Sequence, residues 1–225
     1  MKFDKIALLF YFVLCLLSIF TNIYDFYVLK LMSKSLLIPV LFFYYLGNIK
    51  EIEILPCAYF LFNFIGDSIG IFDFKNEIEY LIIPFFFSNI VILILLLKPL
   101  KKVKFTYFNL FPLLIICSFL VFLWLQIIPF FDFSGQNLQI KIGIYGLSII
   151  LVTFLAAYNI INRVTSSNLH LLICVLCVLF SDIFYVFNNF EIEFIVFDII
   201  HYSCQIFSSF FFVQFVIFRD KQSIT

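Results

Sequence analysis

The chain has 225 residues, of which 64% are hydrophobic and only 12% are charged, and its formal net charge is zero. This composition excludes an ordinary soluble globular domain. The Lys and Arg residues are not clustered as they are in nucleic-acid-binding proteins, so we expect no nucleic-acid partner.

Eight apolar segments follow one another along the chain, and each approaches the roughly 20 residues that a membrane-spanning helix needs. They cover residues 6–21, 26–47, 52–72, 81–97, 108–130, 141–161, 169–188 and 194–218. The first segment lacks a small-residue cleavage site, so we interpret it as a retained helix and not as a signal peptide. The sequence therefore predicts an all-α, polytopic integral membrane protein with eight transmembrane helices in a single domain, residues 1–225.

The basic residues fall on one side of the predicted membrane. With the N-terminus in the cytoplasm, the cytoplasmic side holds Lys2, Lys5, Lys50, Lys98, Lys101, Lys102, Lys104, Arg163, Arg219 and Lys221. The basic residues on the other side are then Lys75 and Lys141. They are accompanied there by Asp25, Asp73, Glu77, Glu79, Asp132, Glu191, Glu193 and Asp198. The positive-inside rule thus predicts a multi-pass protein of the cell (inner) membrane with both termini cytoplasmic.

The two halves of the chain share a pattern. Gly66-Asp67 is followed by Glu77-Ile78-Glu79-Tyr80, and Ser181-Asp182 is followed by Glu191-Ile192-Glu193-Phe194. One interpretation is duplication, with two parallel four-helix repeats, residues 1–104 and 105–225, related by an axis along the membrane normal. The other is chance similarity between acidic outer loops. If the repeat is real, the two aspartates face one central cavity.

Asp67 and Asp182 lie within stretches that are otherwise apolar. A charged side chain at the centre of a transmembrane helix costs about 2.5–3.5 kcal/mol on insertion scales, so such residues usually face the protein interior and serve a function. Helix direction and a rise of about 1.5 Å per residue place further polar groups at the same depth, in the outer half of the bundle. They are Lys34, Asn89, Tyr145, Ser148, Tyr202 and Gln205. Because the inner half is nearly all Leu, Ile, Phe and Val, this layer predicts a pocket.

Each residue of the layer also has a purely structural explanation. Lys34 can neutralise one aspartate or extend to the lipid headgroups. Asn89 and Gln205 can hydrogen-bond between helices. Tyr145 and Tyr202 can be packing residues whose hydroxyl groups are satisfied.

No metal or cofactor site is predicted. Cys174-x-x-Cys177 has no second pair, so these cysteines are better explained as small apolar side chains. His170 and His201 lie at different depths and cannot share a metal ion. No G-x-S-x-G, P-loop or H-E-x-x-H motif occurs, whereas two carboxyl groups in a desolvated site suit acid–base chemistry.

At these residues the chain resembles the YhhN-type family of eight-helix membrane proteins, whose characterised animal members are lysoplasmalogenases. The matching positions, in chain order, are Ser33-Lys34-Ser35-Leu36, Gly66-Asp67, Phe86-Phe87-Ser88-Asn89, Ser181-Asp182 and Tyr202-Ser203-Cys204-Gln205. Ser35 stands where the family usually has proline, and Asn89 stands where it has histidine. Asparagine cannot shuttle a proton, so a mechanism that needs this imidazole cannot use residue 89 here.

The resemblance implies a lipid hydrolase that cleaves the vinyl ether bond of a lysoplasmalogen, a lysophospholipid of the membrane. Our hypothesis is that Asp67 and Asp182 act as acid and stabilising carboxylate, in an order that the sequence does not give. Lys34 would tune one aspartate and meet the phosphate. Asn89, Tyr145, Tyr202 and Gln205 would bind or orient the substrate and water.

Two other functions use the same features. A transporter or lipid carrier also contains buried Asp and Lys residues, although a transport pathway needs polar groups in both halves of the membrane. A lipid-binding protein that has lost catalysis is compatible with Asn89. The oligomeric state, the headgroup and the chain length of the lipid are left open.

Overall fold

A computed structural model describes residues 3–24, 26–70, 77–100, 110–130 and 136–222. Within these ranges the chain forms eight α-helices, one short 3-10 helix and no β-strand, so the all-α prediction is confirmed. The elements are α1 (Phe3–Ile23), α2 (Tyr27–Leu46), α3 (Ile54–Ile69), α4 (Glu77–Leu100), α5 (Leu110–Ile127), η2 (Ile128–Phe130), α6 (Gln136–Asn162), α7 (Ser166–Phe190) and α8 (Ile195–Gln222). Each α-helix contains most of one predicted apolar segment.

Six of these helices, α1, α2, α4, α6, α7 and α8, are long and apolar enough to cross a membrane. The chain therefore has the architecture of a multi-pass membrane protein. Two predicted spans are shorter within the described residues, because α3 has 16 residues and α5 has 18, against about 20 for a complete span. Helix α3 begins after Glu53, whose backbone is extended, and ends at a Gly70 cap. The remaining predicted ends of these spans, residues 71–72 and 108–109, lie outside the described residues.

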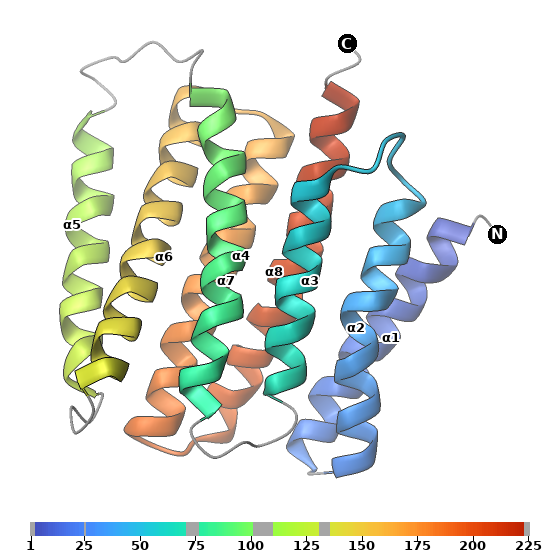
Figure 1. Cartoon of the computed structure of the whole chain (residues 1–225), viewed down its shortest axis with the longest axis horizontal. Helices are drawn as coiled ribbons and strands as arrows, with labels where there is room; N and C mark the ends of the chain where they lie inside the picture. The colour runs from blue at the N-terminus through green and yellow to red at the C-terminus, as the bar shows by residue number, and fades with distance from the viewer. Residues whose placement is uncertain (1–2, 25, 71–76, 101–109, 131–135, 223–225) are drawn as a thin grey trace.

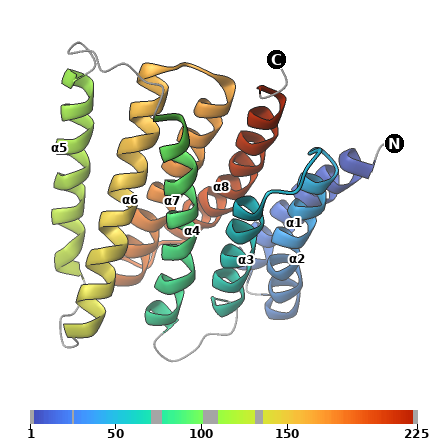
Figure 2. The same ribbon diagram turned by 45° about the horizontal axis from the view of Figure 1, so that its top comes forward.

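Both ends of the described chain lie at the same end of the bundle (Figure 1). We call the end that holds Phe3 and Gln222 the terminal end, and the opposite end, where α7 connects to α8, the distal end. In two views α5 stands at one edge of the bundle, while α1 and α2 stand at the other (Figures 1 and 2). An even number of membrane crossings would produce this placement of the termini.

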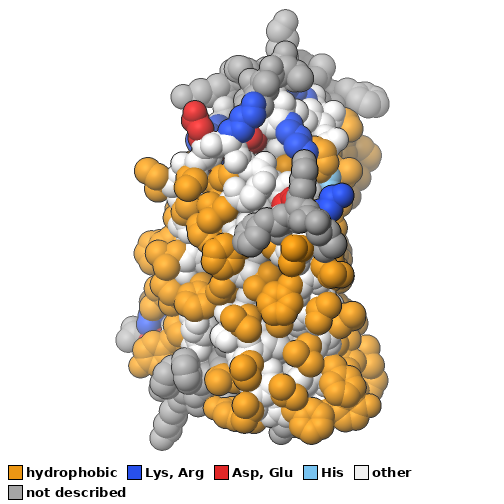
Figure 3. Space-filling model, turned by 90° about the vertical axis from the view of Figure 1, so that its right-hand side faces the viewer, with side chains coloured by type: hydrophobic (Ala, Val, Ile, Leu, Met, Phe, Trp, Pro, Cys, Tyr) orange, Lys and Arg blue, Asp and Glu red, His pale blue; other side chains and the backbone are white. Residues whose placement is uncertain are grey.

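Basic side chains gather at the terminal end, above a broad belt of hydrophobic side chains (Figure 3). The described basic residues at this end are Lys5, Lys50, Lys98, Arg163, Arg219 and Lys221. Lys141 lies at the distal end as predicted, and so does Lys30, which the sequence analysis did not count. Leu16 on α1 and Phe111 on α5 are 71% and 72% exposed, so these side chains suit contact with lipid.

Several charged residues used to predict the orientation lie outside the described residues. They are Lys2, Asp25, Asp73, Lys75, Lys101, Lys102, Lys104 and Asp132. The division into repeats 1–104 and 105–225 stays a prediction.

Aromatic packing fills the interior of the bundle. The ring of Tyr59 on α3 stacks on that of Phe212 on α8, with centroids 3.6 Å apart. The terminal half is more polar than predicted, because Asn159 donates a hydrogen bond to the Leu96 carbonyl oxygen at 3.1 Å and Gln214 donates to the Tyr44 hydroxyl at 3.2 Å. These amides join neighbouring helices, a common use of amides within membranes.

Candidate functional site

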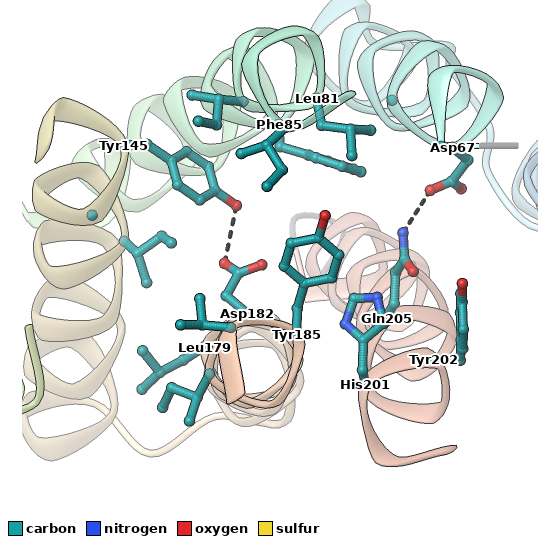
Figure 4. A pocket seen from close by; sticks show the side chains of 18 of the residues that line it. Asp67, Leu81, Phe85, Tyr145, Leu179, Asp182, Tyr185, His201, Tyr202 and Gln205 are labelled. Carbon is teal, nitrogen blue, oxygen red and sulfur yellow. Dashed lines mark hydrogen bonds between the residues drawn. The ribbon is translucent and has the colours of Figure 1, made fainter. Parts of the chain in front are cut away.

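A cavity of about 220 Å³ lies among the helices, and residues from all eight α-helices line it. Asp67, near the end of α3, and Asp182, in the distal part of α7, both line this cavity (Figure 4). Both side chains are half-buried. The two carboxyl groups, which are far apart in the sequence, thus line one cavity from opposite sides, with Tyr185 between them (Figure 4).

One end of the cavity, which we call the charged end, is formed by Lys34, Asp67, Tyr202 and Gln205. Gln205 Nε2 donates a hydrogen bond to Asp67 Oδ1 at 2.7 Å, as Figure 4 shows. Lys34 Nζ lies 3.5 Å from the centroid of the Tyr202 ring, and its positive charge acts on Asp67. Three of the predicted orienting residues therefore surround one aspartate.

Asp182 has different neighbours. The hydroxyl group of Tyr145 on α6 donates a hydrogen bond to Asp182 Oδ2 at 3.0 Å (Figure 4). Leu179, Ile183 and Val186 on the same helix also line the cavity and are apolar, whereas Tyr185 on this helix has a hydroxyl group. The two carboxyl groups thus lie in unlike surroundings, one beside a cation and an amide and the other beside a phenol and aliphatic side chains.

Asn89 does not line the cavity among the described residues. Its side chain is 3% exposed and lies behind Tyr145, with which it forms a hydrogen bond. Its Nδ2 atom also lies 3.4 Å from Ser148 Oγ, to which it donates, and Ser148 in turn donates to the Tyr145 carbonyl oxygen at 2.6 Å. Asn89 is thus placed to support Tyr145, and the prediction from the sequence that it contacts the substrate is not matched by its position.

The sequence did not predict Tyr185 and His201 as site residues, although both line the cavity. Tyr185 on α7 points its hydroxyl group into the space between Asp182 and Gln205 (Figure 4). His201 on α8 also lines the cavity, and its ring centroid lies 5.2 Å from that of Tyr185. The sequence did contain a signal for both residues. Tyr185 follows Asp182 by three residues and His201 precedes Gln205 by four, and residues at these spacings lie on the same face of a helix.

Helices α7 and α8 hold His201 in place. Its Nδ1 atom lies 2.9 Å from both the hydroxyl oxygen and the carbonyl oxygen of Ser181. The Ser181 hydroxyl lies 3.2 Å from the His201 carbonyl oxygen, to which it donates. A hydrogen on Nδ1 can donate to the Ser181 carbonyl, and Nε2 is then the acceptor of the neutral ring.

No group of three His, Cys, Asp or Glu side chains in the described part of the chain could hold a metal ion. The six cysteines are free thiols, and Cys174 is fully buried in the hydrophobic core. The site therefore consists of side chains that exchange protons and donate hydrogen bonds.

Comparison of the chain with protein-family models, curated proteins and solved structures finds no match. Function is therefore inferred from the chemistry of the cavity. Two carboxyl groups held by donors from other helices, in a chamber with mostly apolar walls, have the composition of an acid–base pair.

Proposed function

We propose that this protein is a membrane-embedded lipid hydrolase with eight transmembrane helices, similar to the lysoplasmalogenases, that cleaves the vinyl ether bond of a lysoplasmalogen-like lipid. The observation that carries the proposal is that Asp67 and Asp182 line one cavity with a charged end and apolar walls. A single-chain phospholipid has the same division into a charged and an apolar part.

The reaction begins with transfer of a proton from a neutral carboxylic acid to the alkene carbon next to the hydrocarbon chain. The oxocarbenium ion that forms is stabilised by the second, ionised carboxylate. Water adds to this ion and loses a proton to the second carboxylate. The resulting hemiacetal collapses to a fatty aldehyde and a glycerophospho-alcohol as its hydroxyl proton returns to the first carboxylate and its ether oxygen takes a proton from the second, so both groups are restored and one water molecule is consumed for each bond broken.

The unlike surroundings of the two aspartates support an assignment of roles. Lys34 and the Gln205 amide favour the ionised form of Asp67. We assign the role of proton donor to Asp182, because the cation Lys34 acts on the other aspartate, Asp67, while Asp182 contacts the Tyr145 hydroxyl. In this assignment Tyr145 orients the Asp182 carboxyl group, and Asn89 supports Tyr145.

The remaining cavity residues have supporting roles. Lys34 and Tyr202 meet the phosphate at the charged end, and the resemblance gives Lys34 the same role. Tyr185 and His201 lie between the two carboxyl groups, where they can orient the attacking water.

The basic residues at the terminal end support an orientation with both termini in the cytoplasm. We therefore place the protein in the cell (inner) membrane with the cavity toward the outer leaflet. The shorter helices α3 and α5 would complete the eight spans, as the resemblance implies.

Aldehyde release by the purified protein tests this function. Full-length protein in nanodiscs should release a fatty aldehyde from an alkenyl lysophospholipid but not from the saturated alkyl ether of equal length, which cannot be protonated at carbon. Absence of aldehyde from every alkenyl lysolipid in a panel of headgroups would refute the proposal.

Lipid binding or transport without cleavage is the second candidate, because Asn89 replaces the expected histidine and lies behind Tyr145. A binding protein would retain lysolipid without releasing aldehyde. Flux of labelled lysolipid across sealed vesicles would then separate a transporter from a binding protein.

A further inference from the structure

Helix α5 bounds the cavity from the edge of the bundle. It packs against α6, while α4 and α5 share almost no direct contacts within the described residues. The two helices approach closely at Gly146, where a Cβ atom would lie 2.4 Å from Trp124 Nε1. Helix α5 is thus attached on one side only, and the cavity separates it from α4.

The part of the cavity between α4, α5 and α6 is apolar. Leu81 and Ile82 line it from α4, Leu120 and Trp124 from α5, and Ile150 from α6. We call this part of the cavity the apolar arm. The arm offers aliphatic and aromatic walls to a ligand, so it suits a hydrocarbon chain.

The outer faces of the two helices that flank the arm suit contact with lipid. Ile83 and Phe87 on α4 are 46% and 45% exposed, and Phe119 and Phe122 on α5 are 56% and 57% exposed. Both helices that flank the arm therefore have exposed apolar side chains that suit contact with lipid, although Phe87 also stacks on Phe62 of α3. A hydrocarbon chain that passes between α4 and α5 into the arm would stay among apolar groups.

We propose that the apolar arm is the binding site for the hydrocarbon chain of a single-chain phospholipid, which enters sideways from the bilayer between α4 and α5. Lys34 at the opposite, charged end of the same cavity fixes the direction of the lipid, with the phosphate toward α2 and the chain toward α5. The alkene carbon then lies nearer Asp182 than Asp67.

This inference deepens the proposed function by naming how its substrate binds, but it does not require bond cleavage. A lipid-binding protein with no hydrolase activity would use the same arm. Binding is therefore measured apart from aldehyde release.

The chain has a single tryptophan, Trp124, and its side chain lines the arm. Its fluorescence is therefore a direct reporter of what fills the site. The probe is a lysophosphatidylcholine with bromine atoms on its chain, because bromine quenches indole fluorescence on contact. Full-length protein in nanodiscs of unbrominated diacyl phospholipid should show saturable quenching that unbrominated lysophosphatidylcholine reverses.

A matched pair of variants separates the arm from the surrounding bilayer. Ile150→Phe fills the arm and should weaken the saturable quenching at least tenfold. Leu151→Phe adds the same ring one residue later, at a position that is 45% exposed and does not line the cavity, and should behave as the wild type. Leu81→Phe, which fills the arm, and its control Ile83→Phe repeat the comparison on α4. They replace the α6 pair if the α6 variants do not fold.

Asp182→Asn distinguishes this inference from the proposed function. It should retain saturable quenching even though aldehyde release is lost. The inference would be overturned by quenching that rises in proportion to the amount of probe in the bilayer and that unbrominated lysophosphatidylcholine does not reverse. Such quenching would also be equal in Ile150→Phe and Leu151→Phe. Saturable quenching without aldehyde release in the wild type would support the inference and refute the hydrolase.

Discussion

Gln205 on α8 donates a hydrogen bond of 2.7 Å to Asp67 on α3, across a sequence separation of 138 residues. Tyr145 on α6 holds Asp182 on α7 in a similar way, at 3.0 Å. Each carboxyl group is thus oriented by a donor from a different helix. These hydrogen bonds fix the orientation of the two carboxyl groups, which acid–base chemistry requires.

Gln205→Leu removes the amide donor to Asp67. A hydrogen bond to a charged group is worth about 1.5–3 kcal/mol, so kcat/KM for aldehyde release should fall by roughly 10- to 100-fold. Gln214→Leu is the matched control, because Gln214 also lies on α8 but donates to Tyr44, away from the cavity. Equal activities of the two variants would show that the Asp67 contact has no part in the reaction.

Tyr145→Phe keeps the ring and removes the hydroxyl group that orients Asp182. We expect kcat to fall by about tenfold with little change in KM, since an oriented proton donor acts on the transition state. Tyr158→Phe, on the same helix and outside the cavity lining, should leave both constants unchanged. A loss confined to KM would instead assign Tyr145 to substrate binding.

Lys34→Met removes the cation at the charged end of the cavity. The KM for a phosphate-bearing alkenyl lipid should rise by about tenfold, whereas the KM for an alkenyl glycerol without phosphate should change much less. Lys30→Met, one turn earlier on α2, is the control and lies outside the lining residues. If the KM rises equally for both substrates, Lys34 acts on Asp67 alone and does not contact the phosphate.

Gly146→Ala and Gly143→Ala should change stability in opposite directions. A Cβ atom at Gly146 would lie 2.4 Å from Trp124 Nε1. The free energy of unfolding of Gly146→Ala should therefore fall by about 1–3 kcal/mol, and the tryptophan emission should shift. A Cβ atom at Gly143 meets nothing within 4 Å, and alanine there should gain about 0.5–1 kcal/mol from helix propensity. Thermal unfolding followed by fluorescence measures both. A stable Gly146→Ala variant with unchanged emission would contradict the close packing of α5 on α6.

The depth of the site could be predicted from the sequence. Each residue adds about 1.5 Å along a helix, so alternate helix directions convert positions in the chain into one layer. This reasoning placed Asp67, Asp182, Lys34 and Gln205 together, and all four line one cavity. The apolar segments likewise predicted the eight α-helices, because their composition leaves few alternatives.

The direction in which each side chain points could not be predicted, because it depends on the rotation of each helix about its axis and on which helices pack against it. Asn89 has the right depth but lies behind Tyr145. Tyr185 and His201 were passed over although they share a helix face with Asp182 and Gln205. The arrangement of α5, which is attached to α6 and hardly touches α4, follows from tertiary packing and left no pattern in the sequence.

The most direct test compares aldehyde release by Asp67→Asn, Asp182→Asn and the control Asp220→Asn, which lies near the end of α8 and outside the cavity lining. Each variant is first checked for an unfolding temperature near that of the wild type. Loss of general acid–base catalysis lowers rates by about 10²–10⁴-fold. We predict such losses for Asp67→Asn and Asp182→Asn and wild-type activity for Asp220→Asn, whereas full aldehyde release by either folded cavity variant would contradict the mechanism.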